Sequence, residues 1–206
     1  MADASDTDDI LDGLTGEARA ERAELVQWLL DQGIAADQIE HSVAPILLGT
    51  RRLIGDDGSY LSTREIAGET GLDLELVRRM QRAIGLPTVE DPDAAVYLRA
   101  DAEAIAHTAS FLQLGVDPDE LLVVTRTLAE GLSNAAEAMR YTALATVLRP
   151  GATELEIAKA SAALAEAALP ELWPMVEGLL QVQLRQTFET EAISATERAS
   201  GTSLPG

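Results

Sequence analysis

The stretch that decides the fold runs from Glu171 to Ala199 and reads ELWPMVEGLLQVQLRQTFETEAISATERA. A helix of that length would span roughly 43 Å, well beyond an ordinary globular helix. Its first half repeats apolar residues at helical spacing: Leu172, Val176, Leu180, Leu184 and Phe188. Beyond Phe188 the same face carries only alanines among charged residues. We therefore expect an output helix, with the transition at Phe188, Glu189, Glu191 and Ala192, followed by a Gly/Pro/Ser linker over 201–206.

The composition indicates an all-α protein. Alanine, leucine and acidic residues dominate, aromatics make up only 3%, and long periodic stretches follow one another. The formal net charge of −20 disfavours sequence-independent binding to nucleic acid or to an anionic membrane, because the attraction has the wrong sign. The chain contains no cysteine, no apolar run of membrane-spanning length and no signal peptide, so we expect a cytoplasmic protein without disulfides.

Start and stop signals divide the rest of the chain into helices. Capping boxes begin at Ser62 and Thr153, and Asp117-Pro118 is a strong helix start. The expected helices are 17–32, 36–41, 46–54, 63–70, 73–84, 101–114, 118–148, 154–169 and 171–199. A short extended piece is expected at 96–98. Pro170 is expected to separate the last two helices, because it suits a first turn better than a helix interior.

Residues 60–121 resemble the DNA-binding part of the MerR regulators. Two short helices around Gly71 are followed by the extended piece, a further helix and then a long helix. The second short helix carries Arg78, Arg79 and Arg82 outward, but over residues 51–86 six arginines meet six acids. A protein that contacts several phosphates is normally more basic. A MerR-like transcription regulator is therefore the alternative reading, and an inherited scaffold reused for packing is the preferred one.

Nearly the whole chain resembles a second family, the N-terminal regulatory domain of the mycobacterial pH-responsive class III adenylyl cyclases. The matching runs are 18–22 (ARAER), 28–30 (WLL), 53–58 (LIGDDG), 73–76 (DLEL), 128–133 (LAEGLS), 135–144 (AAEAMRYTAL), 149–155 (RPGATEL), 189–192 (ETEA) and 204–206 (LPG). The resemblance implies an all-helical, intertwined homodimer that holds back or releases a C-terminal cyclase catalytic domain. It also implies a fatty-acid-like ligand in an apolar slot.

The chain carries no catalytic constellation of its own. It has no Gly-rich phosphate loop, no Cys/His metal spacing and no recognisable nucleophile arrangement. Paired carboxylates such as Glu189 and Glu191 are expected to be solvated, because the chain has 35 acidic residues. We therefore expect neither a cofactor nor a metal, and read the chain as a regulatory domain rather than an enzyme.

Candidate sites follow from the few residues suited to sensing or binding. His41 lies near a helix C-terminus and His107 lies four residues after Glu103, so either could respond to pH near neutrality. The resemblance implies a histidine where this chain has Gln186, which would leave clustered carboxylates as the other candidates. Arg140 and Tyr141 could hold the carboxylate of a bound fatty acid. A plain surface histidine, and an arginine paired to Glu137, are the structural alternatives.

Together these observations predict an all-α, multi-helix regulatory domain with a MerR-like helix-turn-helix subfold and long dimerising helices. The expected parts are an N-terminal arm (1–54), the MerR-like segment (55–116), a dimerisation and output region (117–200) and the linker (201–206). The expected partners are a second copy and a cyclase catalytic domain, with a bound fatty acid possible and nucleic acid improbable.

Overall fold

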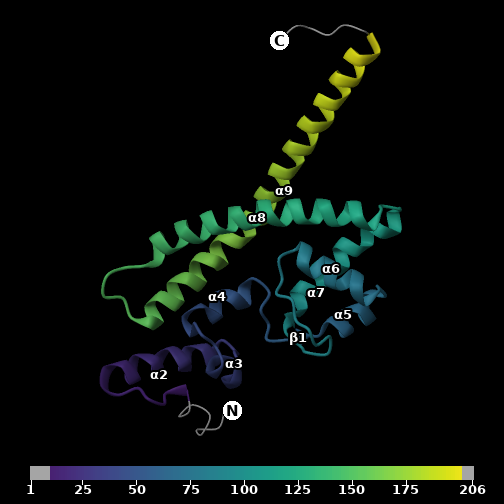
Figure 1. The fold of residues 1–206 in the computed structure, drawn as a ribbon. Helices are drawn as coiled ribbons and strands as arrows, with labels where there is room; N and C mark the ends of the chain where they lie inside the picture. The colour runs from purple at the N-terminus through teal and green to yellow at the C-terminus, as the bar shows by residue number, and fades with distance from the viewer. Residues whose placement is uncertain (1–9, 201–206) are drawn as a thin grey trace. The chain divides into compact units, whose positions relative to one another are not determined.

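The computed structural model describes residues 10–200, with side chains for residues 10–193. The expected linker at 201–206 lies outside the described residues. The chain divides into two compact units, Met1–Ala162 and Ala163–Gly206, each of which is described by itself. The fold is helical, as the composition predicts (Figure 1). The strands within the described residues form a single two-stranded sheet.

The first unit begins with a helical arm, which we define as residues 10–54. It contains α2 (Gly16–Asp31), α3 (Ala36–Glu40), the 3-10 turn η1 (Pro45–Leu47) and α4 (Leu48–Leu53). The arm has its own small apolar core, in which Leu25, Val26 and Leu29 of α2 are fully buried. This core also contains Ala158, which belongs to the start of α9. The arm therefore gains part of its core from a segment far along the chain.

The middle of the first unit consists of two short helices, a two-stranded sheet and a further helix. It contains β1 (Tyr60–Leu61), α5 (Thr63–Thr70), α6 (Leu74–Ala83), β2 (Tyr97–Leu98), α7 (Arg99–Ser110) and η2 (Phe111–Leu114). The strands pair antiparallel, with Tyr60 opposite Leu98 and Leu61 opposite Tyr97. The predicted order of elements is present, whereas the likeness to MerR regulators stays a prediction.

Local sequence signals explain where these elements begin and end. The Ser62 hydroxyl accepts from the Glu65 amide at 3.2 Å, and the Glu65 carboxylate accepts from the Ser62 amide at 2.7 Å, which confirms the capping box. Hydrogen bonding of the Glu65 carboxylate to Ser62, above all to its backbone amide, lowers the pKa of the Glu65 carboxyl. The helix stops at Gly71, whose φ of 69° is in the left-handed region that favours glycine. Ile66, Val77, Met80 and Ile105 then form a fully buried core between α5, α6 and α7.

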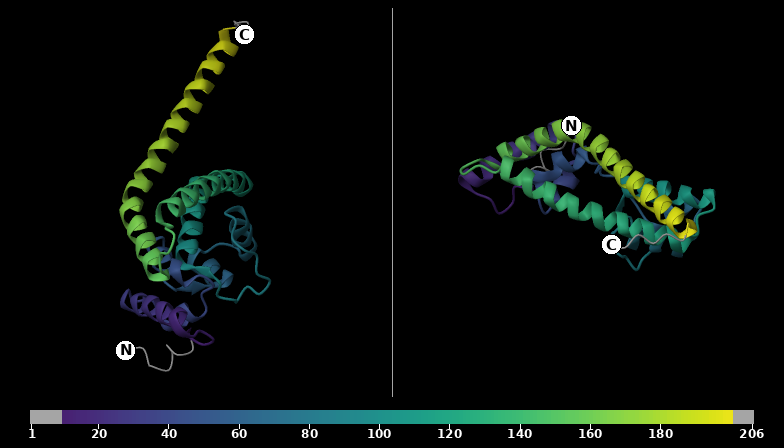
Figure 2. Two further views of the ribbon diagram at one scale, coloured as in Figure 1. Left: turned by 90° about the vertical axis from the view of Figure 1, so that its left-hand side faces the viewer. Right: turned by 90° about the horizontal axis from the view of Figure 1, so that it is seen from above.

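Two long helices complete the described chain. The first is α8 (Pro118–Val147), which starts at the predicted Asp117 cap and runs without a break in the right-hand view of Figure 2. The second is α9 (Glu154–Ser200), which begins with the predicted Thr153 capping box. Many of the large apolar side chains of both helices are exposed.

The expected break at Pro170 is wrong, since α9 continues through both Pro170 and Pro174. A proline inside a helix removes one hydrogen bond, here to the carbonyl four residues earlier. Both prolines are exposed, so water can reach the carbonyls of Glu166 and Pro170 that lose their partners. A proline inside the helix therefore costs little free energy at this position, and the strong helix-forming residues on both sides keep α9 continuous.

Candidate functional site

The most specific long-range polar contact joins the arm to the start of α9, at residues 132 apart in sequence. Arg22 of α2 donates from Nε and one terminal nitrogen to the two carboxylate oxygens of Glu154, each at 2.7 Å. The two side chains are 26% and 34% exposed. The hydrogen bond from Arg22 lowers the pKa of the Glu154 carboxyl, and the bond to Glu154 raises the pKa of the Arg22 guanidinium. The pair is thus ionised throughout the neutral range.

An apolar contact lies beside this ion pair. We call residues 154–162 the base of α9, because the first compact unit ends at Ala162. Within the base, Ala158 is 1% exposed and packs in the arm's core. On the arm, a Cβ at Gly49 would lie 2.8 Å from Cη2 of the Trp28 ring and 3.7 Å from Cβ of Ala162. The arm and the base of α9 therefore form one closely packed junction.

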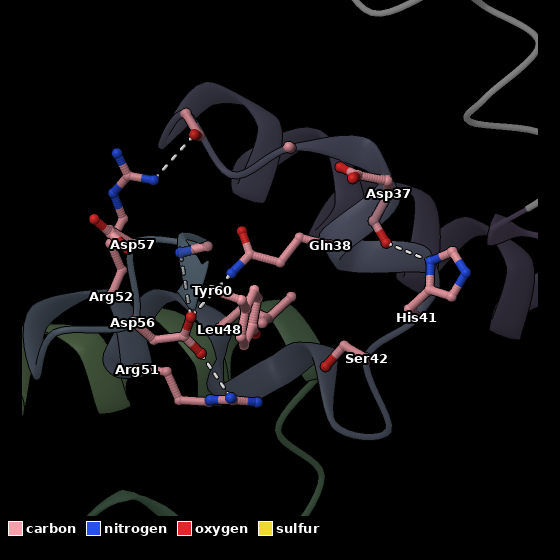
Figure 3. A pocket seen from close by; sticks show the side chains of 13 residues that line it. Asp37, Gln38, His41, Ser42, Leu48, Arg51, Arg52, Asp56, Asp57 and Tyr60 are labelled. Atoms are coloured by element: carbon pink, nitrogen blue, oxygen red, sulfur yellow. Dashed lines mark hydrogen bonds and ion pairs between the residues drawn. The ribbon is translucent and has the colours of Figure 1, made fainter. Parts of the chain in front are cut away.

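The larger of the two cavities described lies in the arm, between α3, α4 and the loop that leads to β1 (Figure 3). It encloses about 480 Å³. Asp56, only 3% exposed, forms an ion pair with Arg51 at 2.6 Å and accepts from the Gly58 amide at 3.3 Å. Arg52 donates to the Gly33 carbonyl at 3.0 Å. The lining of this cavity mixes cationic and acidic side chains. No group of three potential metal ligands occurs among the described residues.

The two histidines lie in different places. His41 lines the cavity directly after the end of α3, and its Nδ1 lies 2.7 Å from the carbonyl oxygen of Asp37 in the first turn of that helix (Figure 3). His107 is exposed on α7, and its carbonyl oxygen accepts from the Ser110 hydroxyl at 2.6 Å. The structure does not bring the two histidines to one site.

A titratable carboxyl that the sequence reasoning missed lies where the arm meets α7. Burial raises the pKa of the Asp101 carboxyl, the hydrogen bond that the Leu98 amide donates to it opposes that shift, and the nearby charge of Asp56 adds to it. The loop after α4 lies close to the start of α7, since a Cβ added at Gly55 would lie only 2.9 Å from Cβ of Ala100. The run at 53–58 contains both Gly55 and Asp56, but nothing in the sequence indicates that α7 packs against it.

The candidate ligand residues lie on the exposed surface of α8. Tyr141 is 75% exposed, and the Arg140 guanidinium lies 3.9 Å from the Glu137 carboxylate, with both side chains largely exposed. Neither residue lines either of the two cavities described. The predicted output residues are also exposed, and Phe188 is 70% exposed on α9.

The arginines of α6, which would contact DNA in a MerR-like protein, bind groups of this chain instead. Arg78 donates to the Glu90 carbonyl at 3.1 Å, and Arg82 donates to Glu75 at 3.1 Å. Arg79 forms an ion pair with Asp119 at the start of α8. The carboxylates of Glu75 and Asp119 offset the charges of Arg82 and Arg79, which phosphate binding would need.

Comparison with known proteins assigns the chain. The adenylate cyclase regulatory domain family matches residues 3–188. The chain belongs to this family. It is also 57% identical over 205 residues to a pH-sensitive adenylate cyclase of Mycobacterium tuberculosis, a match that covers 100% of the chain and 52% of that protein. The chain thus spans about half the length of the curated relative that it matches and is itself the regulatory, non-catalytic part.

This assignment confirms the predicted family resemblance and gives the ion pair a context. Arg22 and Glu154 each fall inside a run that carried that resemblance, 18–22 and 149–155. Each run alone reads as an ordinary helix start, so the sequence offered no sign that the two would meet. Within the described residues, no helix is both long enough and apolar enough to cross a membrane.

Proposed function

We propose that this regulatory domain controls a class III adenylate cyclase catalytic domain in the same polypeptide, which it holds back or releases. The support is that the chain matches the family description and about half of a relative named as a pH-sensitive adenylate cyclase. The chain contributes no catalytic group in this proposal. Its role is to change the arrangement of the domain that it is joined to.

We further propose that two copies of the chain associate through their long helices. The observation that carries this proposal is an exposed apolar row on α8, with Val124, Leu128 and Leu132 exposed by 63%, 46% and 44%. These residues follow each other at four-residue spacing, as a helix that packs against another helix would have them. Apolar rows of this kind on a solvent-exposed surface indicate an association site.

The second unit supports the same proposal by itself. On α9, Leu180, Leu184 and Phe188 repeat at four-residue spacing and are 45%, 47% and 70% exposed. Most helical stability in proteins comes from packing an apolar face, so we propose that this exposed row packs against a partner surface. In our proposal this helix transmits the conformational change to the catalytic domain. A change from Ala192 to Pro in the cyclase-linked protein should then alter regulation.

The association is tested by the mass of the chain in solution. Light scattering should give twice the 21.9 kDa of one chain. The change Leu128→Glu should shift the mass toward one chain, because it places a charge in the apolar row. Ser133→Glu, an exposed position on another side of α8, should leave the mass unchanged. A single-chain mass for the unmodified protein would contradict the dimer.

Responses to pH and to a fatty acid form the finer part of the proposal. The relative is named for pH sensitivity, and the groups we propose for a response here are His41, His107 and partly buried carboxyls such as Asp101. Arg140 and Tyr141 are proposed to hold a fatty-acid carboxylate. Mass spectrometry of the intact purified chain should then detect the ligand, and Arg140→Ala should release it.

The cyclase proposal is tested by joining the chain to the half of the mycobacterial relative that it does not match. Cyclase activity should differ between this fusion and that half alone, across pH 5.5–8 as an approximate assay range around histidine titration. Equal activity at every pH would contradict the proposal.

The alternative, a MerR-like DNA-binding regulator, has less support because the α6 arginines bind groups of the chain. A gel shift at low salt with upstream DNA would reveal it.

A further inference from the structure

We infer that the arm is a latch on the base of α9, and that the Arg22–Glu154 ion pair holds the latch closed. This inference rests on the proposed regulatory function and names the contact through which the arm would act. In the closed latch the arm fixes residues 154–162, from which the rest of α9 continues. In the open latch those residues lose the support of the arm.

The position of the contact is the first argument for a latch. The arm contacts α9 at Glu154, Ala158 and Ala162, which are spaced four residues apart and so lie on one side of the helix. The compact unit ends at Ala162, so the arm holds the last two turns before the helix passes into the second unit. A contact at this point can change the start of the helix without touching the remainder.

The chemistry of the contact is the second argument. The apolar part is small, because Ala158 and Ala162 contribute only methyl groups to it. The polar part is strong for its size, since both bonds are 2.7 Å long, charged and parallel. Because the pair is partly buried, solvent ions screen its charge attraction less than they would screen that of an exposed pair. The ion pair therefore supplies a large share of the free energy that keeps the arm packed on the base of α9. Its loss should open the junction without unfolding the arm's core.

The first experiment measures hydrogen exchange in the 206-residue chain. Arg22→Met keeps the apolar stem of the side chain and removes its charge, and Glu154→Gln removes only the charge of its partner. Each change should raise the exchange rate of peptides within 155–162 by about tenfold, which corresponds to about 1.4 kcal/mol. The double variant should add little to either single variant, because both remove the same interaction.

The matched control is the ion pair between Arg64 of α5 and Asp93 in the loop before β2. It also has two bonds, at 2.6 and 3.3 Å, but its side chains are 58% and 62% exposed. Arg64→Met and Asp93→Asn should leave the exchange of 155–162 unchanged. If Arg22→Met did not fold, Arg22→Lys, which keeps the charge but cannot form both bonds, would take its place. Unchanged exchange at 155–162 in the Arg22 and Glu154 variants would overturn the latch.

The second experiment separates the latch from the proposed function. In the fusion with the relative's other half, Arg22→Met and Glu154→Gln should change cyclase activity by severalfold, and the Arg64 variant should not. If removal of the whole chain changes activity but the latch variants do not, the latch is overturned as a regulatory contact. If removal of the chain changes nothing, the proposed function fails, and the exchange experiment still decides whether the contact holds the base of α9.

Discussion

A methyl group added at Gly49 should weaken the junction between the arm and the base of α9. Gly49 is buried in α4. The new Cβ of Gly49→Ala would lie 2.8 Å from Cη2 and 3.2 Å from Cζ3 of the Trp28 ring, closer than carbon atoms normally approach. The ring must therefore move, and it can do so only by loosening its packing in the arm.

The magnitude follows from two opposing effects. Overpacking a well-packed site costs about 1–3 kcal/mol, whereas replacing a glycine inside a helix by alanine contributes about 1 kcal/mol. The Trp28 ring is only partly buried, which gives it some room to shift. We expect a net loss of about 1 kcal/mol, which lowers the melting temperature by about 2–4 °C for a chain of this size.

Gly68 supplies the matched control. It also lies inside a helix, α5, but it is exposed and a Cβ there would meet nothing within 4 Å. Gly68→Ala should therefore stabilise the chain by about 0.5–1 kcal/mol. The two substitutions are chemically identical, so their opposite signs would isolate the contact with Trp28.

Tryptophan fluorescence is the suitable assay because the chain has two tryptophans. Trp173 is 60% exposed on α9, and Trp173→Phe leaves Trp28 as the single reporter of the arm. Urea unfolding followed by this signal gives the stability of the arm, and circular dichroism recorded on the same samples gives the stability of the helices that include Gly68, even if the chain unfolds in more than one step. An equal gain in stability from Gly49→Ala and Gly68→Ala would refute the packing described for Gly49.

Substitutions at three further positions test contacts in the middle of the first unit. The raised pKa of Asp101 gives a stabilisation that is full below the ordinary value of about 3.9 and is lost as pH rises through the folded value. Asp101→Asn should therefore flatten stability against pH in the mildly acidic range, measured by urea unfolding from pH 4 to 7; an unchanged curve would contradict this. Tyr97→Phe removes the bond from a buried hydroxyl to the Pro87 carbonyl, 2.9 Å long, and should cost about 1–2 kcal/mol by chemical denaturation. Ser62→Ala removes a helix cap and should cost about 1 kcal/mol, whereas Ser62→Thr, which keeps the hydroxyl, should cost less.

Local signals in the sequence predicted most of the helices. The caps at Ser62, Asp117 and Thr153 form the predicted bonds, because each depends on residues only two or three positions apart. The break at Pro170 was wrong because a proline's cost depends on whether its freed carbonyl can reach water, which the sequence does not state. The family was also predictable, since long runs of residues carried the resemblance.

The candidate site was less predictable, for a physical reason. The contact of Arg22 with Glu154 depends on how two helices far apart in sequence pack, and periodicity gives only the side of each helix that is buried. The same holds for Asp101, whose shifted pKa comes from burial and from Asp56 on another element. Single residues with suitable chemistry, such as His107, can be named from sequence, but their neighbours cannot.

The two prolines inside α9 give this helix a preferred direction of bending. Pro170 and Pro174 are one turn apart, so the two missing hydrogen bonds lie on the same side of the rod. That side resists stretching less than the opposite side, which keeps its full ladder of bonds. A force on this helix should therefore be converted into a hinge-like flexing in one plane, rather than into twisting or melting along its whole length.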